Sequence, residues 1–209
     1  YKYTCMEYRD NISPFVCEPE GILKSNASYI NCSYTDGSRI CDFNTCCKLK
    51  ITNDNIHDAV NLWMTNKDSA IKTYGEINTW DTSNVTDMSN LFLDKKNFND
   101  KKNFNDNISG WKVDNVTKMA KMFYGAGAFN QNIGNWNVSN VTDMSMMFYG
   151  AEAFNQNIGN WNVSNVTNMK SMFNDARAFN QDIGGWDVSS VTNMTCLLYT
   201  SDAADESSS

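Results

Sequence analysis

The sequence predicts an α/β solenoid built from 25-residue coils, each with one short parallel strand and one short helix. Trp111, Trp136, Trp161 and Trp186 lie 25 residues apart, and each opens the frame Trp-x-Val-x-x-Val-Thr-x-Met. Phenylalanine, isoleucine and glycine recur at the same interval. Because one such unit cannot bury its apolar residues alone, neighbouring units are expected to stack and share an interior.

Residues 1–50 are predicted to form a small segment held together by disulfides. Six cysteines fall within its first 47 residues: Cys5, Cys17, Cys32, Cys41, Cys46 and Cys47. A zinc site would need Cys-x2-Cys pairs or histidines, and this stretch has neither. Disulfides indicate an oxidising, extracytoplasmic compartment. The pairing stays open, since six cysteines allow about 15 connectivities.

The same segment contains candidate glycosylation sites. Asn26 and Asn31 each open an Asn-x-Ser/Thr sequon. Sequons within the repeats copy one another and give no independent evidence. We therefore expect glycans at Asn26 and Asn31 if the source is eukaryotic.

Residues 51–75 are predicted to form a helical cap at the start of the solenoid. Apolar residues recur at the spacing of one helix face: Ile56, Ala59, Val60, Trp63 and Met64. Asp54 or Asn55 can begin this helix, and a second helical turn is expected over residues 69–74, ending at Gly75.

Residues 76–195 are predicted to contain about five coils. Between Val141 and Met147 the apolar residues are three apart, which favours a short helix capped by Ser139 or Thr142 and ending near Gly150. The asparagine-rich run over residues 154–161 favours the strand, with turns at its end.

Two polar features of the repeat are expected to serve its interior. Asn130, Asn155 and Asn180 each follow a phenylalanine and are predicted to form a ladder that satisfies backbone groups of adjacent coils. The tryptophans are predicted to be core residues whose indole N–H needs a partner. An exposed tryptophan row that stacks on sugars is the alternative.

The first interval is longer than the others. Trp80 and Trp111 are 31 residues apart because Lys-Lys-Asn-Phe-Asn-Asp occurs twice, at 95–100 and 101–106. We expect this insertion to loop out of the coil between Phe92 and Ile108, since deforming the stack would cost the neighbouring coils their packing.

Residues 196–209 are predicted to be an artefact. The run Cys-Leu-Leu-Tyr-Thr-Ser-Asp-Ala-Ala-Asp-Glu from 196 to 206 matches a translated sequencing adapter. The natural chain is then expected to continue with more repeats.

The run Met-Phe-Tyr-Gly-Ala-Glu-Ala-Phe-Asn-Gln-Asn-Ile-Gly-Asn-Trp-Asn-Val-Ser-Asn-Val-Thr-Asn-Met at 147–169 resembles BspA-like leucine-rich-repeat surface proteins. The specific likeness is to the bacterial surface and mycoplasma lipoprotein-associated repeat of about the same length. The lead-in over residues 59–83 is similar to versions from algae and other protists. The resemblance implies a leucine-rich-repeat-like fold, an extracellular or cell-surface location and a role in adhesion or recognition, with no catalytic residue.

Composition and motifs narrow the function. The net charge of -7 and the absence of basic clusters argue against nucleic-acid partners, and no apolar run is long enough for a membrane span. With one histidine, His57, and no phosphate loop, the sequence predicts no enzyme, cofactor or metal site. A calcium-stabilised solenoid is disfavoured, because the Gly-Gly-x-Gly-x-Asp nonapeptide is absent.

The sequence therefore predicts a module that binds a protein or glycan partner. A structural spacer for another domain is the alternative. The candidate binding face consists of amide and acidic side chains expected to point outward from the strands: Gln131, Asn132, Asn135, Gln156, Asn157, Asn160, Gln181 and Asp182.

Overall fold

The computed structural model describes residues 4–6, 16–18, 48–93 and 104–199. Near the N-terminus, β1 (Thr4–Met6) pairs antiparallel with β2 (Val16–Glu18), and the register places the backbone of Cys5 opposite that of Cys17. The side chains of the six cysteines, together with Asn26 and Asn31, lie outside the described residues. The disulfide and glycosylation predictions therefore remain predictions.

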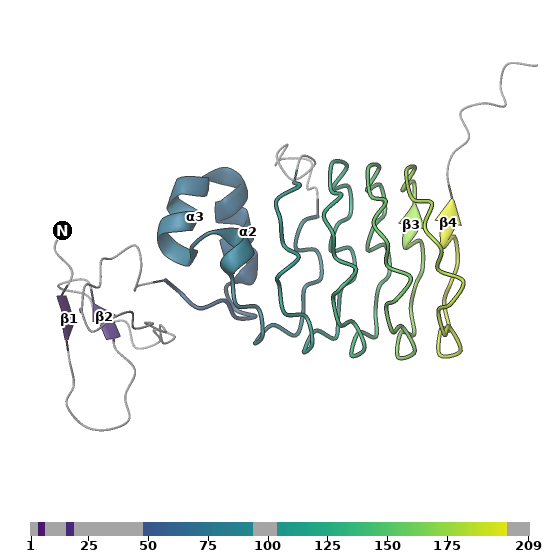
Figure 1. Cartoon of the computed structure of the whole chain (residues 1–209), viewed down its shortest axis with the longest axis horizontal. Coiled ribbons are helices and arrows are strands. Elements are labelled where there is room, and N and C mark those ends of the chain that lie inside the picture. The colour runs from purple at the N-terminus through teal and green to yellow at the C-terminus, as the bar shows by residue number, and fades with distance from the viewer. Residues whose placement is uncertain (1–3, 7–15, 19–47, 94–103, 200–209) are drawn as a thin grey trace, which may run out of the picture.

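Two helices cover one end of a stack of coils (Figure 1). In α2 (Ile56–Thr65), Ile56, Ala59, Val60 and Trp63 are buried. The second helix, α3 (Lys67–Tyr74), begins two residues earlier than the sequence indicated, because the Asn66 side chain accepts a hydrogen bond from the Ser69 N–H.

Gly75 ends α3 with a φ of 86°, a conformation that residues with a Cβ rarely adopt. A 3₁₀ turn, η1 (Ile77–Thr79), then leads into the first coil. Trp63 of α2 packs edge-on against Trp80 of that coil, with ring centroids 6.0 Å apart. The Trp80 indole N–H donates to the Gly75 carbonyl at 2.9 Å, which ties the end of α3 to the stack.

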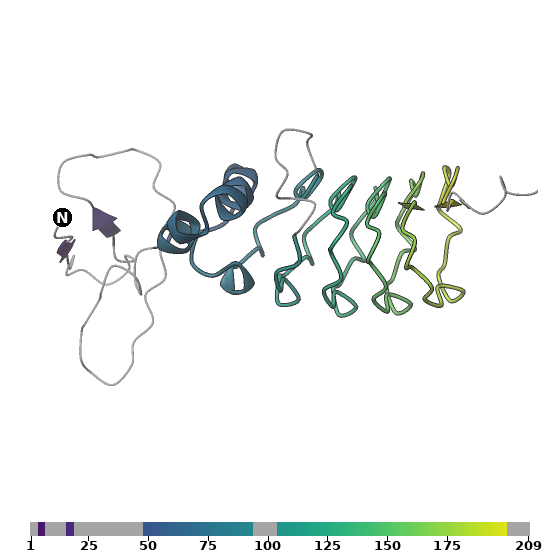
Figure 2. The ribbon, with the colours of Figure 1, turned by 90° about the horizontal axis from the view of Figure 1, so that it is seen from above.

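Successive coils lie side by side and are joined by parallel backbone pairing (Figure 2). One bridge residue per coil forms an unbroken series across the stack: Asp87, Lys118, Asp143, Asn168 and Asn193. From Lys118 onward these residues are 25 apart. Residues that occupy the same place in the repeat are therefore neighbours in space.

The interior consists of apolar rows running along the stack. Phe123, Phe148 and Phe173 stack with centroids 5.5 and 5.6 Å apart, and a second row contains Phe129 and Phe154 at 5.9 Å. Within one coil the two rows touch, with the Phe148 and Phe154 centroids 4.0 Å apart. Burial of these large rings is the main source of stability that the coils share.

The tryptophan row also lies in the interior. Trp80, Trp111, Trp136, Trp161 and Trp186 expose between 3% and 9% of their surface. Most of their indole N–H groups donate to a backbone carbonyl of an earlier segment, as Trp161 does to Ile133 at 3.2 Å. The indole nitrogen of Trp136 has no hydrogen-bond partner within the described part of the chain. A row of exposed tryptophans for sugar stacking is therefore not available.

The predicted division of each coil into one helix and one strand is wrong. Residues 141–150 contain no helix. Alternate N–H groups there bond to the next coil instead, as Met144 does to Asn168 at 2.9 Å and Met146 to Lys170 at 2.8 Å. Residues 154–161, where the strand was expected, are not a strand and contain local turns. Short parallel strands occur only once in the described coils, where β3 (Phe173–Asn174) pairs with β4 (Leu198–Tyr199).

The apolar spacing of three comes from consecutive turns. Val141 N–H bonds to Val138, Met147 to Met144, and Phe154 to Ala151, and all of these side chains are buried. Each turn changes the direction of the chain and returns the third residue to the interior. Left-handed residues contribute to these changes of direction: Met146 has a φ of 55° and Gly150 a φ of 66°.

The duplicated segment enters the stack through its second copy. Phe104 packs on Phe92 with centroids 3.9 Å apart and on Phe129 at 5.9 Å, so it occupies the place of Phe129 one coil earlier. Residues 94–103 lie outside the described part, so the looped-out insertion remains a prediction.

The last described coil exposes apolar side chains that are buried in the others. Val188 and Met194 are 39% and 38% exposed, whereas Val163 and Met169, their counterparts one coil earlier, are 1% and 0% exposed. Residues 196–199 continue the repeat frame through β4, and the other residues predicted to be an artefact, 200–209, lie outside the described part.

Replacing Gly159 with alanine is expected to destabilise the stack. A Cβ at this position would lie 2.6 Å from the Asp182 carbonyl oxygen in the next coil, closer than real Cβ atoms come. We expect a loss of about 1–3 kcal/mol in the free energy of unfolding, measured by urea titration of the whole chain. Gly185→Ala is the matched control, because nothing lies within 4 Å of its Cβ position. Equal losses in the two variants would contradict the close-approach argument.

Candidate functional site

The asparagine ladder on the predicted amide face connects adjacent coils. The Asn130 side-chain oxygen accepts from the Asn155 N–H at 3.0 Å, and that of Asn155 accepts from the Asn180 N–H at 3.0 Å. The ladder begins at Asn105, whose side-chain oxygen accepts from the Asn130 N–H at 2.9 Å. These asparagines supply acceptors for backbone groups that no carbonyl reaches.

The glutamines of the predicted binding face belong to this ladder. Gln156 donates to the carbonyl and side-chain oxygens of Asn130, at 3.0 and 2.8 Å, and Gln131 makes the same pair of bonds to Asn105. Gln181 donates to the Asn155 side-chain oxygen at 2.9 Å. Their amides hold the coils together, which reduces their freedom to recognise a ligand.

The remaining residues of the predicted face are more exposed. Asn132, Asn157 and Asp182 each accept a hydrogen bond from the glycine N–H two residues later, at 3.0, 3.0 and 2.8 Å. These bonds close the turns and fix the side chains. Asn135 and Asn160 are exposed at the following turn positions. The predicted face therefore reduces to a rim of exposed turn residues beside the ladder.

A second polar surface lies where the sequence suggested a helix. Two columns of exposed side chains flank the valine of each Asn-Val-Thr or Ser-Val-Thr unit, and we call them the Asn–Thr strip. The valine is buried in each Asn-Val-Thr unit and half-buried at Val191. The first column is Asn84, Asn115, Asn140, Asn165 and Ser190. The second column is Thr86, Thr117, Thr142, Thr167 and Thr192. The sequence signal was the Asn-Val-Thr unit itself, whose buried valine places both neighbours outward.

Hydrogen bonds between coils fix both columns. The Thr142 hydroxyl donates to the Thr117 carbonyl at 3.2 Å, and the Thr167 hydroxyl donates to the Thr142 carbonyl at 3.1 Å. The Asn140 amide donates to the Asp114 carbonyl at 2.6 Å and the Asn165 amide to the Ser139 carbonyl at 2.7 Å. The asparagines from Asn115 to Asn165 and the threonines from Thr117 to Thr192 thus bond to equivalent carbonyls in the coil before.

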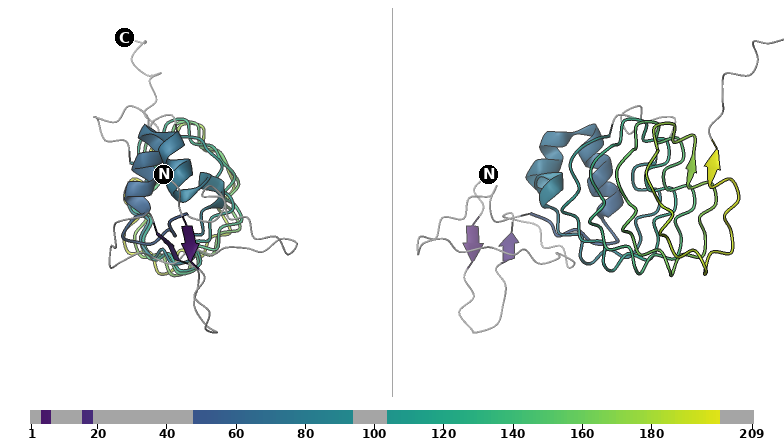
Figure 3. Two further views of the ribbon diagram at one scale, coloured as in Figure 1. Left: turned by 90° about the vertical axis from the view of Figure 1, so that its left-hand side faces the viewer. Right: turned by 45° about the vertical axis from the view of Figure 1, so that its right-hand side comes forward.

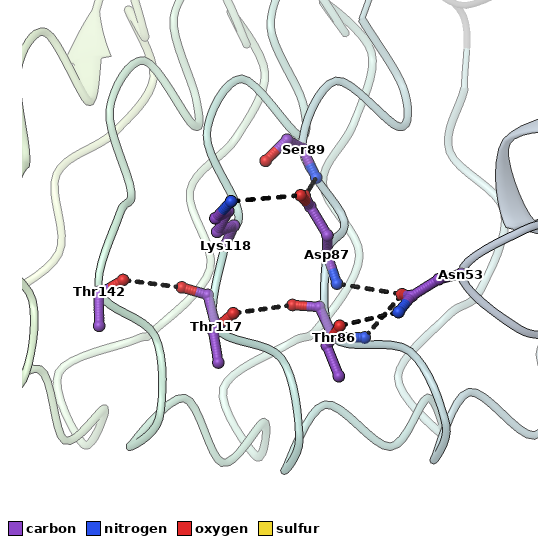
Figure 4. A network of polar contacts seen from close by, with 7 residues as sticks. All are labelled: Asn53, Thr86, Asp87, Ser89, Thr117, Lys118 and Thr142. Atoms are coloured by element: carbon purple, nitrogen blue, oxygen red, sulfur yellow. Dashed lines mark hydrogen bonds and ion pairs between the residues drawn. The ribbon is translucent and has the colours of Figure 1, made fainter.

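Asn53 ends the threonine column on the side of the helical cap (Figure 4). Its side-chain oxygen accepts from the N–H groups of Thr86 and Asp87 at 2.9 and 3.3 Å, and its amide donates to the Thr86 hydroxyl at 2.8 Å. In the inner coils a threonine carbonyl accepts the equivalent N–H, as Thr117 does from Thr142 at 2.9 Å. Asn53 therefore substitutes for the coil that would precede the first one.

Charged side chains flank the strip near its N-terminal end. Lys118 lies 3.9 Å from Asp87, and Lys112 lies 3.6 Å from Asp81. Burial raises the pKa of Asp81, but hydrogen bonds from Ser83 and the charge of Lys112 outweigh it, so the pKa lies below its ordinary value. These exposed pairs neutralise one another and contribute little to stability.

The described residues contain no group of three or more His, Cys, Asp or Glu side chains placed to hold a metal ion. The hollow beside α3 is lined by side chains of mixed charge and one isoleucine. His57 lies exposed on α2, away from any such group.

Neither described α-helix is of the length and apolarity that crossing a membrane requires.

Comparison with known proteins identifies a family. The family model described as "Mycoplasma protein of unknown function, DUF285" matches residues 60–102 and 95–209. These ranges contain the helix α3 and every coil of the stack. No curated protein and no solved structure matches the chain significantly.

Asn53→Ala is expected to fray the first coil. It removes the acceptor for two N–H groups and the donor to the Thr86 hydroxyl. We expect a loss of about 1–2 kcal/mol in the free energy of unfolding, with faster hydrogen exchange at the Thr86 amide. Asn61→Ala, at an exposed position of α2, is the control. Unchanged exchange at Thr86 in the Asn53 variant would argue against the capping role.

Proposed function

The chain belongs to the family described as Mycoplasma protein of unknown function, DUF285, and we propose that it is a non-enzymatic solenoid protein that binds a protein or glycan partner outside the cell. Within that family we place it among the BspA-like leucine-rich-repeat surface proteins, in the version found in algae and protists. The support for this finer assignment is the Trp-x-Val-x-x-Val-Thr-x-Met frame and the lead-in before Trp80.

The observation that carries the binding proposal is the regularity of the exposed polar rows. Every coil of the Asn–Thr strip carries asparagine or serine in one column and threonine in the other. Bonds of 2.6–3.2 Å to the preceding coil hold the asparagines from Asn115 to Asn165 and the threonines from Thr117 to Thr192. Groups fixed before the ligand arrives lose little conformational entropy on binding. A rigid surface of amides and hydroxyls favours partners rich in hydrogen-bonding groups, such as glycans and extended peptides.

A structural spacer is the second candidate. It is favoured by the use of Asn130, Asn155 and the glutamines beside them for holding coils together. A stack stiffened in this way can present a neighbouring domain at a distance without binding anything itself.

Binding assays separate the two candidates. We expect the purified full-length chain to bind a subset of a glycan array, or to cross-link to defined proteins on intact cells, at micromolar concentration. Heat-unfolded chain is the control for adhesion through exposed apolar groups. Blank results in both assays with folded protein would contradict the binding role and favour the spacer.

The disulfides, from which the extracellular location is inferred, can be tested through the cysteines. Cys196 is exposed and unpaired, and it is one of seven cysteines in the chain. We expect chain produced in an oxidising compartment to take up one maleimide under denaturing conditions without reductant, because the other thiols are in disulfides. Mass spectrometry counts the adducts, and Cys196→Ser should take up none. Labelling of all seven cysteines before reduction would contradict the disulfides.

A further inference from the structure

The Asn–Thr strip carries no charge in any of its coils. Each of its ten positions is asparagine, serine or threonine and is exposed. Elsewhere the chain is 20% charged and has a net charge of -7. A surface without charged groups does not attract ions. A neutral ligand can also bind it without removing water from a charged side chain, which would cost much free energy.

The hydrogen bonds within the strip decide what it offers to a ligand. From Thr117 to Thr192 the threonine hydroxyls use their one proton on the preceding coil, as Thr192 does on the Thr167 carbonyl at 3.1 Å. A hydroxyl that donates inward keeps its lone pairs for the outside. The asparagine amides likewise donate to the preceding coil, as Asn115 does to the Ser83 carbonyl at 2.8 Å. The threonine column therefore presents acceptors at a fixed interval to a ligand that supplies donors.

Resting on the proposed function, we propose that the Asn–Thr strip binds an uncharged, unbranched polysaccharide that lies along the stack, one sugar residue to each coil. Hydrogen-bonded chain segments lie roughly 4.8 Å apart, close to the length of one sugar in an extended chain. Equivalent aromatic rings on adjacent coils lie 4.7–6.0 Å apart, from the Tyr124–Tyr149 pair to the Trp80–Trp111 pair. Sugar hydroxyls supply the donors that the threonines need.

Other ligand classes fit the strip less well. An acidic polysaccharide would be repelled by the net charge of -7. A folded protein partner usually covers an apolar centre, and the strip exposes only asparagine, serine and threonine. A small molecule would engage one coil and gain nothing from the repetition. A ligand that repeats with the coils gains from each added contact.

The test is calorimetric titration of the full-length chain with β-1,4-linked oligosaccharides of glucose, mannose and N-acetylglucosamine, from one to seven residues long. We expect affinity for at least one series to increase with length until the strip is spanned, at about five residues, and then to level off. Alginate, an acidic polysaccharide, should not bind. Equal affinity for the monosaccharide and the pentasaccharide, or no binding of any neutral series, would overturn the proposal.

Two strip variants and one matched control locate the site. Thr142→Lys with Thr167→Lys should weaken binding by at least about tenfold. Thr142→Val with Thr167→Val keeps the β-branched shape and removes only the hydroxyls, which also bond to the preceding coil. Weaker binding by a variant that the urea titration shows to be fully folded before denaturant is added identifies the role of the hydroxyls. Asn135→Lys with Asn160→Lys adds the same charge at exposed positions of the amide face and should bind normally.

The outcomes separate this inference from the proposed function. If the strip variants bind as the unmodified chain does, or if only the amide-face variant loses binding, the Asn–Thr strip is not the site. In either case, continued recognition of glycans or cell-surface proteins by the same variants would leave the proposed function standing.

Discussion

Backbone hydrogen bonding between coils is the constraint on which the rest of the structure depends. Each coil donates N–H groups to the next at 2.7–2.9 Å, as Met119 does to Asp143 and Met144 does to Asn168. Because the pairing is parallel and in register, each side chain lies beside the side chain at the same position of the next repeat. The phenylalanine rows, the asparagine ladder and the threonine column all follow from that register.

The coils stabilise one another because none has a separate interior. Val163 and Met169 are almost fully buried, while Val188 and Met194, at the same places in the last described coil, are more than a third exposed. This difference in exposure shows how much of the apolar surface of each coil is covered by the coil that follows it. At the opposite end α2 covers the interior, and Asn53 satisfies the first threonine N–H. The stability of the stack therefore comes from contacts between neighbouring coils, as is typical of repeat proteins.

The stack also determines how its polar groups can be used. Side chains that bond across coils become rigid, and those on the amide face spend much of their bonding capacity on the fold. The threonine hydroxyls differ, because one inward bond leaves the oxygen lone pairs facing solvent. The same interaction that holds the coils in register thus produces an ordered surface of acceptors.

The sequence by itself determined the period, the buried residues and the helical cap, because a side chain such as Trp136 or Phe148 must be buried in any compact arrangement of these repeats. The tertiary structure alone decided the path of the backbone within a coil. A spacing of three between Val141, Met144 and Met147 fits one face of a helix and equally fits consecutive turns, and only the bonds to the next coil distinguish the two. The tertiary structure also decided that Phe104 packs in the stack. The sequence alone could not assign this position, because the duplicated segment contains the same residues twice. Local pattern cannot resolve such choices, because their energies depend on contacts with the neighbouring coil, as between Met144 and Asn168.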